Sequence, residues 1–158
     1  MLIYIWIRFE WQFSLGAIIA LMHDVIITVG IFSFLSYEVN LSIVAAVLTI
    51  VGYSMNDTVV IFDRIRENLK KYSKISISDI SNISTNETLS RTLITSVTTL
   101  LALFSIYIFG GAILKGFSFA MIIGVIVGTY SSIFVATPIL NYTNVSQKTV
   151  LKDNTENN

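Results

Sequence analysis

The sequence predicts an all-α protein, a polytopic bundle of four transmembrane helices preceded by the end of a further one. Residues of the AVILMFWYC set make up 54% of the 158 residues, and charged residues only 13%, against about 25% in soluble domains. Four apolar stretches are each long enough to cross a hydrocarbon core of about 30 Å. Nine of the 10 Lys and Arg residues fall on one side of the predicted bundle.

The first element is the apolar run at residues 1–7. A helix needs about 20 residues to cross a bilayer, so this run is too short to be a span. We interpret it as the remnant of a transmembrane helix whose beginning is absent, which predicts an N-terminally truncated chain. The alternative is a short segment lying in the membrane interface.

The four full spans are predicted at residues 13–35, 41–62, 91–109 and 117–140, within a bundle that covers residues 8–142. Short turns at residues 36–40 and 110–116 join the first span to the second and the third to the fourth. A soluble helical core would show a long polar face on each helix, and these segments show none.

A loop of 26 residues, 63–88, separates the second and third spans. Ile61, Ile65 and Leu69 recur every four residues, so we expect the second span to continue as an amphipathic helix to about Tyr72. Ser78 is predicted to cap a second, short helix. The polar tail at residues 143–158 is expected to be disordered.

The basic residues predict the orientation of the bundle. Arg8, Lys148, Lys152 and the six basic residues of 64–91 lie on one side, and only Lys115 lies on the other. The positive-inside rule places the first group, and the C-terminus, in the cytoplasm. The net charge is zero, so no nucleic-acid partner is implied, and membrane lipids are the expected surroundings.

Metal, disulfide and enzyme chemistry find no support in the sequence. There is no cysteine and a single histidine, His23, so we expect no metal site and no resident cofactor. The P-loop, G-x-S-x-G and H-E-x-x-H patterns are absent. An intramembrane aspartic protease would need two carboxylates meeting at mid-depth, and the sequence contexts of such proteases are also absent. We therefore predict that the protein is not an enzyme.

The fourth span carries a helix-packing stripe of small residues at intervals of four: Ala120, Gly124, Gly128, Ser132 and Ala136. Small residues at this spacing let helix backbones approach closely in a membrane. The stripe predicts a face buried against protein. Its contact is either a sliding one in a moving bundle or static packing, and the spacing fits both.

Two carboxylates lie at membrane depth. Asp57 follows Asn56 in the second span, and Asp24 belongs to a second stripe of small and polar residues in the first span. Carboxylates at this depth commonly mark proton or cation pathways. Asp24 fits a structural carboxylate equally well, and His23 lies about 100° around the helix from it, on a different face. Arg91 suits a counter-ion, although position alone favours an anchor at the membrane surface.

Five motifs resemble those of the SecD/SecF family, and of its SecF branch in particular. The main one is GYSMNDTVVIFDRIRENL at residues 52–69. RFEW at 8–11, ALMHDVIIT at 20–28, RTLITSVTTL at 91–100 and KGFSFAMIIGVIVGTYSSIFVATP at 115–138 agree as well. The motifs occur in the family's order and extend over nearly all of residues 2–140.

The resemblance implies an RND-type fold in the bacterial inner membrane, paired with SecD, that couples a proton or sodium gradient to late steps of protein export. The partners it implies are the SecYEG channel, a YajC-type accessory protein and the preprotein, which contacts a periplasmic part missing here. It places the family's intramembrane acid at Asp57 and its essential arginine at Arg91. With Asn56 and Asp24, these form the predicted ion-coupling set. The alternative is a module that only scaffolds SecD or the channel.

Overall fold

The computed structural model describes residues 11–36, 40–72, 75–143 and 145. The predicted helix remnant at 1–7, Arg8 and nearly all of the predicted tail lie outside the described residues. The described chain is helical and contains no strand, which confirms the all-α class. Its elements are α2 (Trp11–Phe34), α3 (Leu41–Lys71), α4 (Ile77–Phe109), α5 (Gly111–Ser131), a π-helical turn (Ser132–Ala136) and α6 (Thr137–Tyr142).

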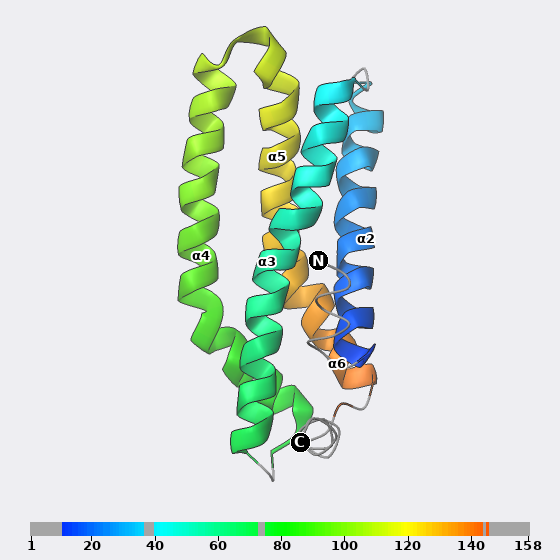
Figure 1. The fold of residues 1–158 in the computed structure, drawn as a ribbon, viewed down its shortest axis with the longest axis vertical. Helices are drawn as coiled ribbons and strands as arrows, with labels where there is room; N and C mark the ends of the chain where they lie inside the picture. Colours follow the sequence, from blue (N-terminus) through cyan, green and yellow to red (C-terminus); the bar gives the residue numbers. More distant parts are fainter. Residues whose placement is uncertain (1–10, 37–39, 73–74, 144, 146–158) are drawn as a thin grey trace, which may run out of the picture.

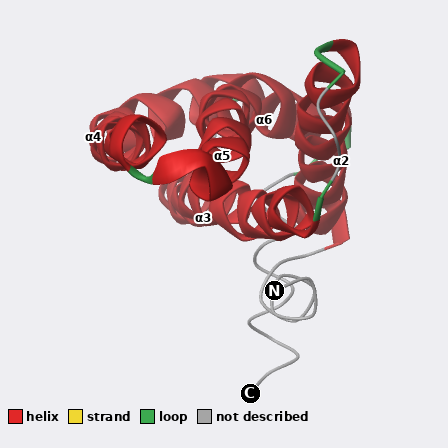
Figure 2. Ribbon diagram, turned by 90° about the horizontal axis from the view of Figure 1, so that it is seen from above, coloured by secondary structure: helices red, strands yellow, loops and turns green. Residues whose placement is uncertain are grey.

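The helices run alternately up and down, and α5 is the central one. Figure 1 shows α4 on one flank, α2 on the other and α5 between them, and the view from above in Figure 2 agrees. Helix α5 packs against α2, α3 and α4. Four helical segments are long and apolar enough to cross a membrane: Trp11–Phe34, Leu41–Lys71, Ile77–Phe109 and Gly111–Tyr142.

Helix α3 extends well beyond its apolar part. It begins after Asn40, whose side chain accepts a hydrogen bond from the Ile43 N–H, and it ends at Lys71 with Tyr72 as the C-cap. Ile61, Ile65 and Leu69 are all buried. The period-four pattern therefore forms the inner face of one continuous helix, as the sequence predicts.

Helix α4 is continuous, and the prediction of a separate short helix before a span starting at residue 91 is wrong. Its N-cap is Ser76, not Ser78, and the Ser76 hydroxyl accepts a hydrogen bond from the Asp79 N–H at 3.2 Å. No glycine or proline interrupts residues 77–109. The hydroxyls of Ser84 and Thr88 donate to backbone carbonyls four residues earlier, so these buried polar groups are satisfied within the helix. Such back-bonding often bends helices, and α4 bends in its lower part (Figure 1).

The turn between α4 and α5 is much shorter than the predicted 110–116. Helix α4 ends at Phe109 and α5 begins at Gly111, so only Gly110 separates them. Gly111 adopts a φ of 75°, a left-handed conformation that glycine reaches without a steric penalty. The chain reverses there, and residues 112–116 become the first turns of α5.

The small residues of α5 and the π-helical turn lie at the centre of the bundle. Ala120, Gly124, Gly128, Ser132 and Ala136 are all buried. A Cβ at Gly124 would fall 2.3 Å from Cγ1 of Ile50, and one at Gly128 would fall 3.2 Å from Cβ of Ser54. The absence of side chains at these two glycines is therefore what lets α5 approach α3 closely.

Two apolar clusters fill the bundle, one toward each end. Phe13 and Phe62 belong to the first cluster and meet edge to face, with ring centroids 5.4 Å apart. Phe32, Ile50 and Val125 belong to the second. Buried polar side chains of α2, α3, α5 and the π-helical turn lie between the clusters: Asp24, Ser54, Asp57, Thr58, Ser131 and Ser132. This polar layer positions the candidate site.

Candidate functional site

Asp57 is a buried carboxylate with an unsatisfied oxygen. Its side chain is 4% exposed. Its Oδ2 atom finds no hydrogen-bond partner in the described part of the chain. Leaving a buried carboxylate oxygen unpaired is costly, so this atom is chemically open to a proton, a cation or a water molecule.

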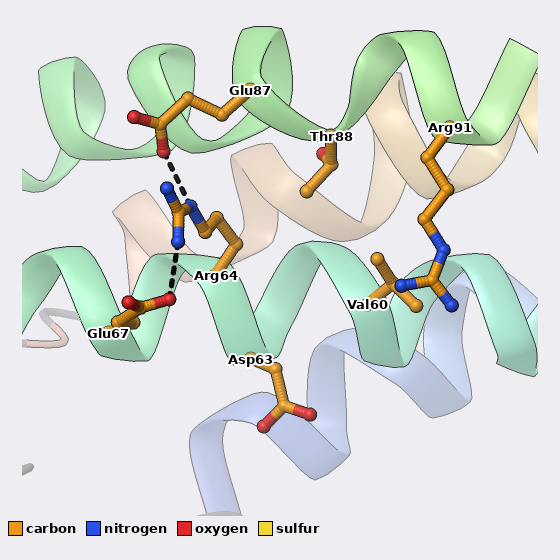
Figure 3. Close-up of a pocket in the computed structure, with 7 residues that line it drawn as sticks. All are labelled: Val60, Asp63, Arg64, Glu67, Glu87, Thr88 and Arg91. Atoms are coloured by element: carbon orange, nitrogen blue, oxygen red, sulfur yellow. Dashed lines mark hydrogen bonds and ion pairs between the residues drawn. The ribbon is translucent and has the colours of Figure 1, made fainter.

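Arg91 reaches from α4 toward α3, close to this carboxylate. Figure 3 shows its side chain extended beside Val60 of α3. The guanidinium is close enough for its positive charge to act on Asp57. No direct ion pair joins the two among the residues that the structure describes. The arrangement puts a permanent positive charge near the open carboxylate without neutralising it by contact.

An open pocket of about 350 Å³ lies between α3 and α4 beside Arg91. Figure 3 shows the side chains that line it: Val60, Asp63, Arg64, Glu67, Glu87, Thr88 and Arg91. Five of the seven carry charge, which makes the pocket hydrophilic. It reaches Arg91 of α4 and Val60 of α3, and Val60 lies about one helical turn from Asp57.

Arg64 connects the two walls of this pocket. Its Nε donates to Glu87 Oε2 at 2.6 Å, and its Nη1 donates to Glu67 Oε2 at 2.5 Å. Asn68 Nδ2 also donates to Glu87 Oε2, at 2.8 Å. The hydrogen bond from Asn68, and then that from Arg64, lower the pKa of Glu87, which lies outside the apolar segment of α4. Sequence analysis missed this cluster because no local pattern reveals that Glu87 faces Arg64 across a turn.

Asp24 is also buried, at 1% exposed, but its oxygens are all partnered. Ser54 of α3 and Ser131 of α5 donate to its Oδ2, at 2.5 Å and 2.8 Å. His23 Nδ1 lies 3.0 Å from its Oδ1. His23 and Asp24 leave the helix about 100° apart, on different faces, but their side chains lean toward each other and meet at this contact.

Asn56 is not brought together with Asp57. Its side chain is exposed on the outer surface of α3, whereas Asp57 and Thr58 are buried. The Thr58 and Ser132 hydroxyls lie 2.9 Å apart between α3 and the π-helical turn. Of the four predicted ion-coupling residues, the structure places Asp57 and Arg91 near each other, Asp24 in a separate three-helix contact, and Asn56 on the outside.

No group of three His, Cys, Asp or Glu residues capable of holding a metal ion occurs among the described residues. What the geometry offers is a carboxylate at membrane depth, a nearby fixed positive charge and a hydrophilic pocket about one helical turn along α3 from the carboxylate. Intramembrane carboxylates in such settings serve proton and cation pathways. The fold and the site together define a polytopic membrane protein of helical-bundle architecture with an ionisable centre between its helices.

Comparison with known proteins identifies the family. A family model described as "Protein export membrane protein SecD/SecF, C-terminal" matches residues 1–146. This chain belongs to the SecD/SecF family.

Among curated relatives, the chain is similar to the protein translocase subunit SecF of Cereibacter sphaeroides, with 52% identity over 96% of this chain and 47% of the relative. For the subunit of that name from Rickettsia bellii, identity is 59% over 88% of this chain and 46% of the relative. The chain thus spans about half the length of these relatives.

Solved structures agree. SecDF from Thermus thermophilus, described as a translocon-associated membrane protein, superposes with a TM-score of 0.86 at 44% identity, covering 91% of this chain and 20% of that one. SecDF in a super-membrane-facing form gives a TM-score of 0.86 at 41% identity, covering 98% and 21%. The resemblance predicted from the motifs is confirmed.

Proposed function

We propose that this chain supplies the membrane bundle of a SecF-type subunit that couples a proton or sodium gradient to late steps of Sec-dependent protein export. The observation that carries the proposal is Asp57, a buried carboxylate with one oxygen unpartnered within the described residues. Arg91 and the hydrophilic pocket nearby supply what an ion-exchanging carboxylate needs.

In the proposed mechanism Asp57 binds the ion and Arg91 favours its release. Ion binding neutralises a buried charge, and neutralisation biases the bundle between two packings. Movement of one charge across 100 mV is worth about 2.3 kcal/mol, which is enough to shift such an equilibrium substantially. Helices α5 and α3 approach closely at Gly124 and Gly128. In the proposed mechanism the two packings of the bundle differ in how α5 sits against α3 at this contact.

The partners and the location belong to the same proposal. The chain would pair with SecD, as the SecDF structures that it resembles suggest, and would act beside the SecYEG channel and a YajC-type protein. The preprotein would be contacted by a periplasmic part outside this sequence. The positive-inside rule then orients the C-terminus toward the cytoplasm of a bacterial inner membrane. The activity is transport, with no covalent step and no resident cofactor.

A second candidate function is a scaffold that holds SecD or the channel without moving ions. The observation that favours it is the tight packing of Gly124 against Ile50, which also suits a static bundle. The two functions differ in what they require of Asp57, since a scaffold needs its shape and a coupler needs its charge.

The experiment is export of a secreted reporter in cells depleted of their own SecF. The chain is supplied in fusion with the N-terminal portion of a SecF relative, with Asp57 intact or as Asp57→Asn. Asp79→Asn, an exposed carboxylate in the first turn of α4, is the matched control. Coupling predicts that Asp57→Asn abolishes export at equal membrane levels while Asp79→Asn retains it. Full export by Asp57→Asn would favour the scaffold function over ion coupling.

A further inference from the structure

A second buried carboxylate, Asp24, is left unexplained by the ion-binding role of Asp57. We propose that Asp24 is a positioning residue for ion coupling, which holds α3 and α5 in register at the level of Asp57 through hydrogen bonds from Ser54 and Ser131. The proposal rests on the proposed function, because Asp57 is the group that it positions.

The geometry of the contact joins three helices at one atom. Asp24 belongs to α2, Ser54 to α3 and Ser131 to α5, and both hydroxyls donate to the same Oδ2. All three side chains are at most 3% exposed, so water does not compete for these bonds. Such a shared acceptor fixes the two serines relative to each other as well as to Asp24.

The contact lies one helical turn from the ion-binding centre. Asp57 and Thr58 follow Ser54 by three and four residues on α3, and Ser132 follows Ser131 directly. The Thr58 and Ser132 hydroxyls meet at 2.9 Å, and the Thr58 hydroxyl also donates to the Ser54 carbonyl. If α5 moved along α3 at the two serines, Ser132 would move relative to Thr58, the residue next to Asp57. The packing around Asp57 would then change.

The hydrogen-bonding states of the two acids distinguish their roles. Asp24 has partners on both carboxylate oxygens, two serines on Oδ2 and His23 on Oδ1. Asp57 keeps an oxygen with no partner among the described residues. A carboxylate engaged by three fixed groups is suited to hold helices together, and one with an open oxygen is suited to exchange an ion.

The chemistry of the contact predicts which substitutions it tolerates. Asparagine keeps an oxygen that can accept from both serines, and its amide can donate to a neutral His23 nitrogen. Leucine has a similar size but no acceptor. It leaves the buried Ser54 hydroxyl without its acceptor and the Ser131 hydroxyl with only its longer contact to the Gly128 carbonyl, at 3.2 Å. A positioning residue therefore tolerates Asp24→Asn and not Asp24→Leu, whereas an ion carrier tolerates neither.

The test combines export with a direct measure of register. The chain has no cysteine of its own. A Thr58→Cys/Ser132→Cys pair therefore introduces the sole disulfide that this chain can form, and the pair lies at the level of Asp57. Reporter export is measured in the fusion described above. Cross-linking of the pair under mild oxidation is measured in the same fusion, in membranes containing equal amounts of each variant.

We expect Asp24→Asn to keep both export and cross-linking. We expect Asp24→Leu to lose about tenfold in both, the effect of leaving buried polar groups unpaired. Asp57→Asn should lose export and keep cross-linking. If the leucine variant does not accumulate, a Ser54→Ala/Ser131→Ala variant, which keeps the carboxylate, should show the same double loss.

Two results would overturn the proposal. One is loss of export in Asp24→Asn with cross-linking unchanged, which would make Asp24 an ion carrier. The other is normal cross-linking in both Asp24→Leu and the double serine variant. Cross-linking does not depend on export, so it tests the positioning role even if Asp57→Asn exports normally and the proposed function fails.

Discussion

Nε of Arg64 lies 2.6 Å from Oε2 of Glu87 and ties the helix that carries Asp57 to the helix that carries Arg91. Asn68 reinforces the contact from α3 through its own hydrogen bond to the same oxygen. The pair lies at the hydrophilic pocket shown in Figure 3, beyond the apolar parts of both helices. It therefore bridges α3 and α4 at this pocket.

The Arg64–Glu87 contact predicts a pH-dependent contribution to stability. The pKa of Glu87 is lowered in the folded protein by Asn68 and Arg64. Its contribution is therefore fully present above the ordinary value of 4.5 and is lost as the pH falls through the lowered folded value. We predict that Glu87→Gln lowers the thermal unfolding temperature in detergent at neutral pH, and that the difference from wild type disappears in strong acid.

Glu67→Gln is the matched control for that variant. Glu67 also accepts from Arg64, but both residues belong to α3, so this pair does not join two helices. Its removal should change the unfolding temperature less than Glu87→Gln does. Equal effects of the two variants would show that the cross-helix bond has no special role.

The glycine at the α3–α5 contact gives a second prediction. In Gly124→Ala the new methyl group would collide with the buried Ile50 side chain. We expect the free energy of unfolding to fall by about 1–3 kcal/mol, the usual cost of overpacking. Chemical unfolding in micelles measures it. Ile50→Ala in the same chain makes room but opens a cavity of its own, so the losses of the two substitutions should be less than additive.

Gly52→Ala serves as the control for Gly124→Ala. A Cβ at Gly52 would meet nothing within 4 Å, and alanine is favoured over glycine within a helix by up to about 1 kcal/mol. The control should leave stability unchanged or slightly raised. A comparable loss in both variants would indicate that helix bending, and not the contact with Ile50, explains the effect.

Arg91 gives a third prediction, because its role depends on charge and on shape. Arg91→Gln removes the positive charge that acts on Asp57, and we expect export to be lost. Arg91→Lys keeps the charge on a more compact group with fewer donors, and we expect export to be reduced but measurable. The reporter assay at matched membrane levels checks both variants. Normal export by Arg91→Gln would contradict a counter-ion role.

The fold class was predictable because spanning segments must be long and apolar, and each of the four apolar stretches lies within a described helical segment to within one residue. The continuity of α4 was not predictable from hydropathy, since residues 77–90 are polar. Within them the buried hydroxyls of Ser84 and Thr88 donate to carbonyls of the helix backbone, so burying these polar residues is compatible with the helix. The change from α-helix to a π-helical turn at Ser132–Ala136 was not predictable either, because small residues continue at intervals of four through it.

The site was predictable in its residue types and not in its contacts. A carboxylate at membrane depth marks Asp24 and Asp57 from sequence alone. Their different hydrogen-bonding states depend on Ser54 and Ser131, which are 30 and 107 residues from Asp24. No local pattern encodes which helices meet or at what level. Asn56 shows the converse, since it is adjacent to Asp57 in sequence but leaves the helix about 100° away and is exposed.

The most direct test of the central claim is ion movement through the assembled subunit. The full-length fusion is co-expressed with SecD, and ion flux down an imposed proton or sodium gradient is followed in inverted membrane vesicles. We predict flux with Asp57 intact, for one of the two ions, and none above background with Asp57→Asn. Equal flux in the two variants would contradict ion coupling through this carboxylate.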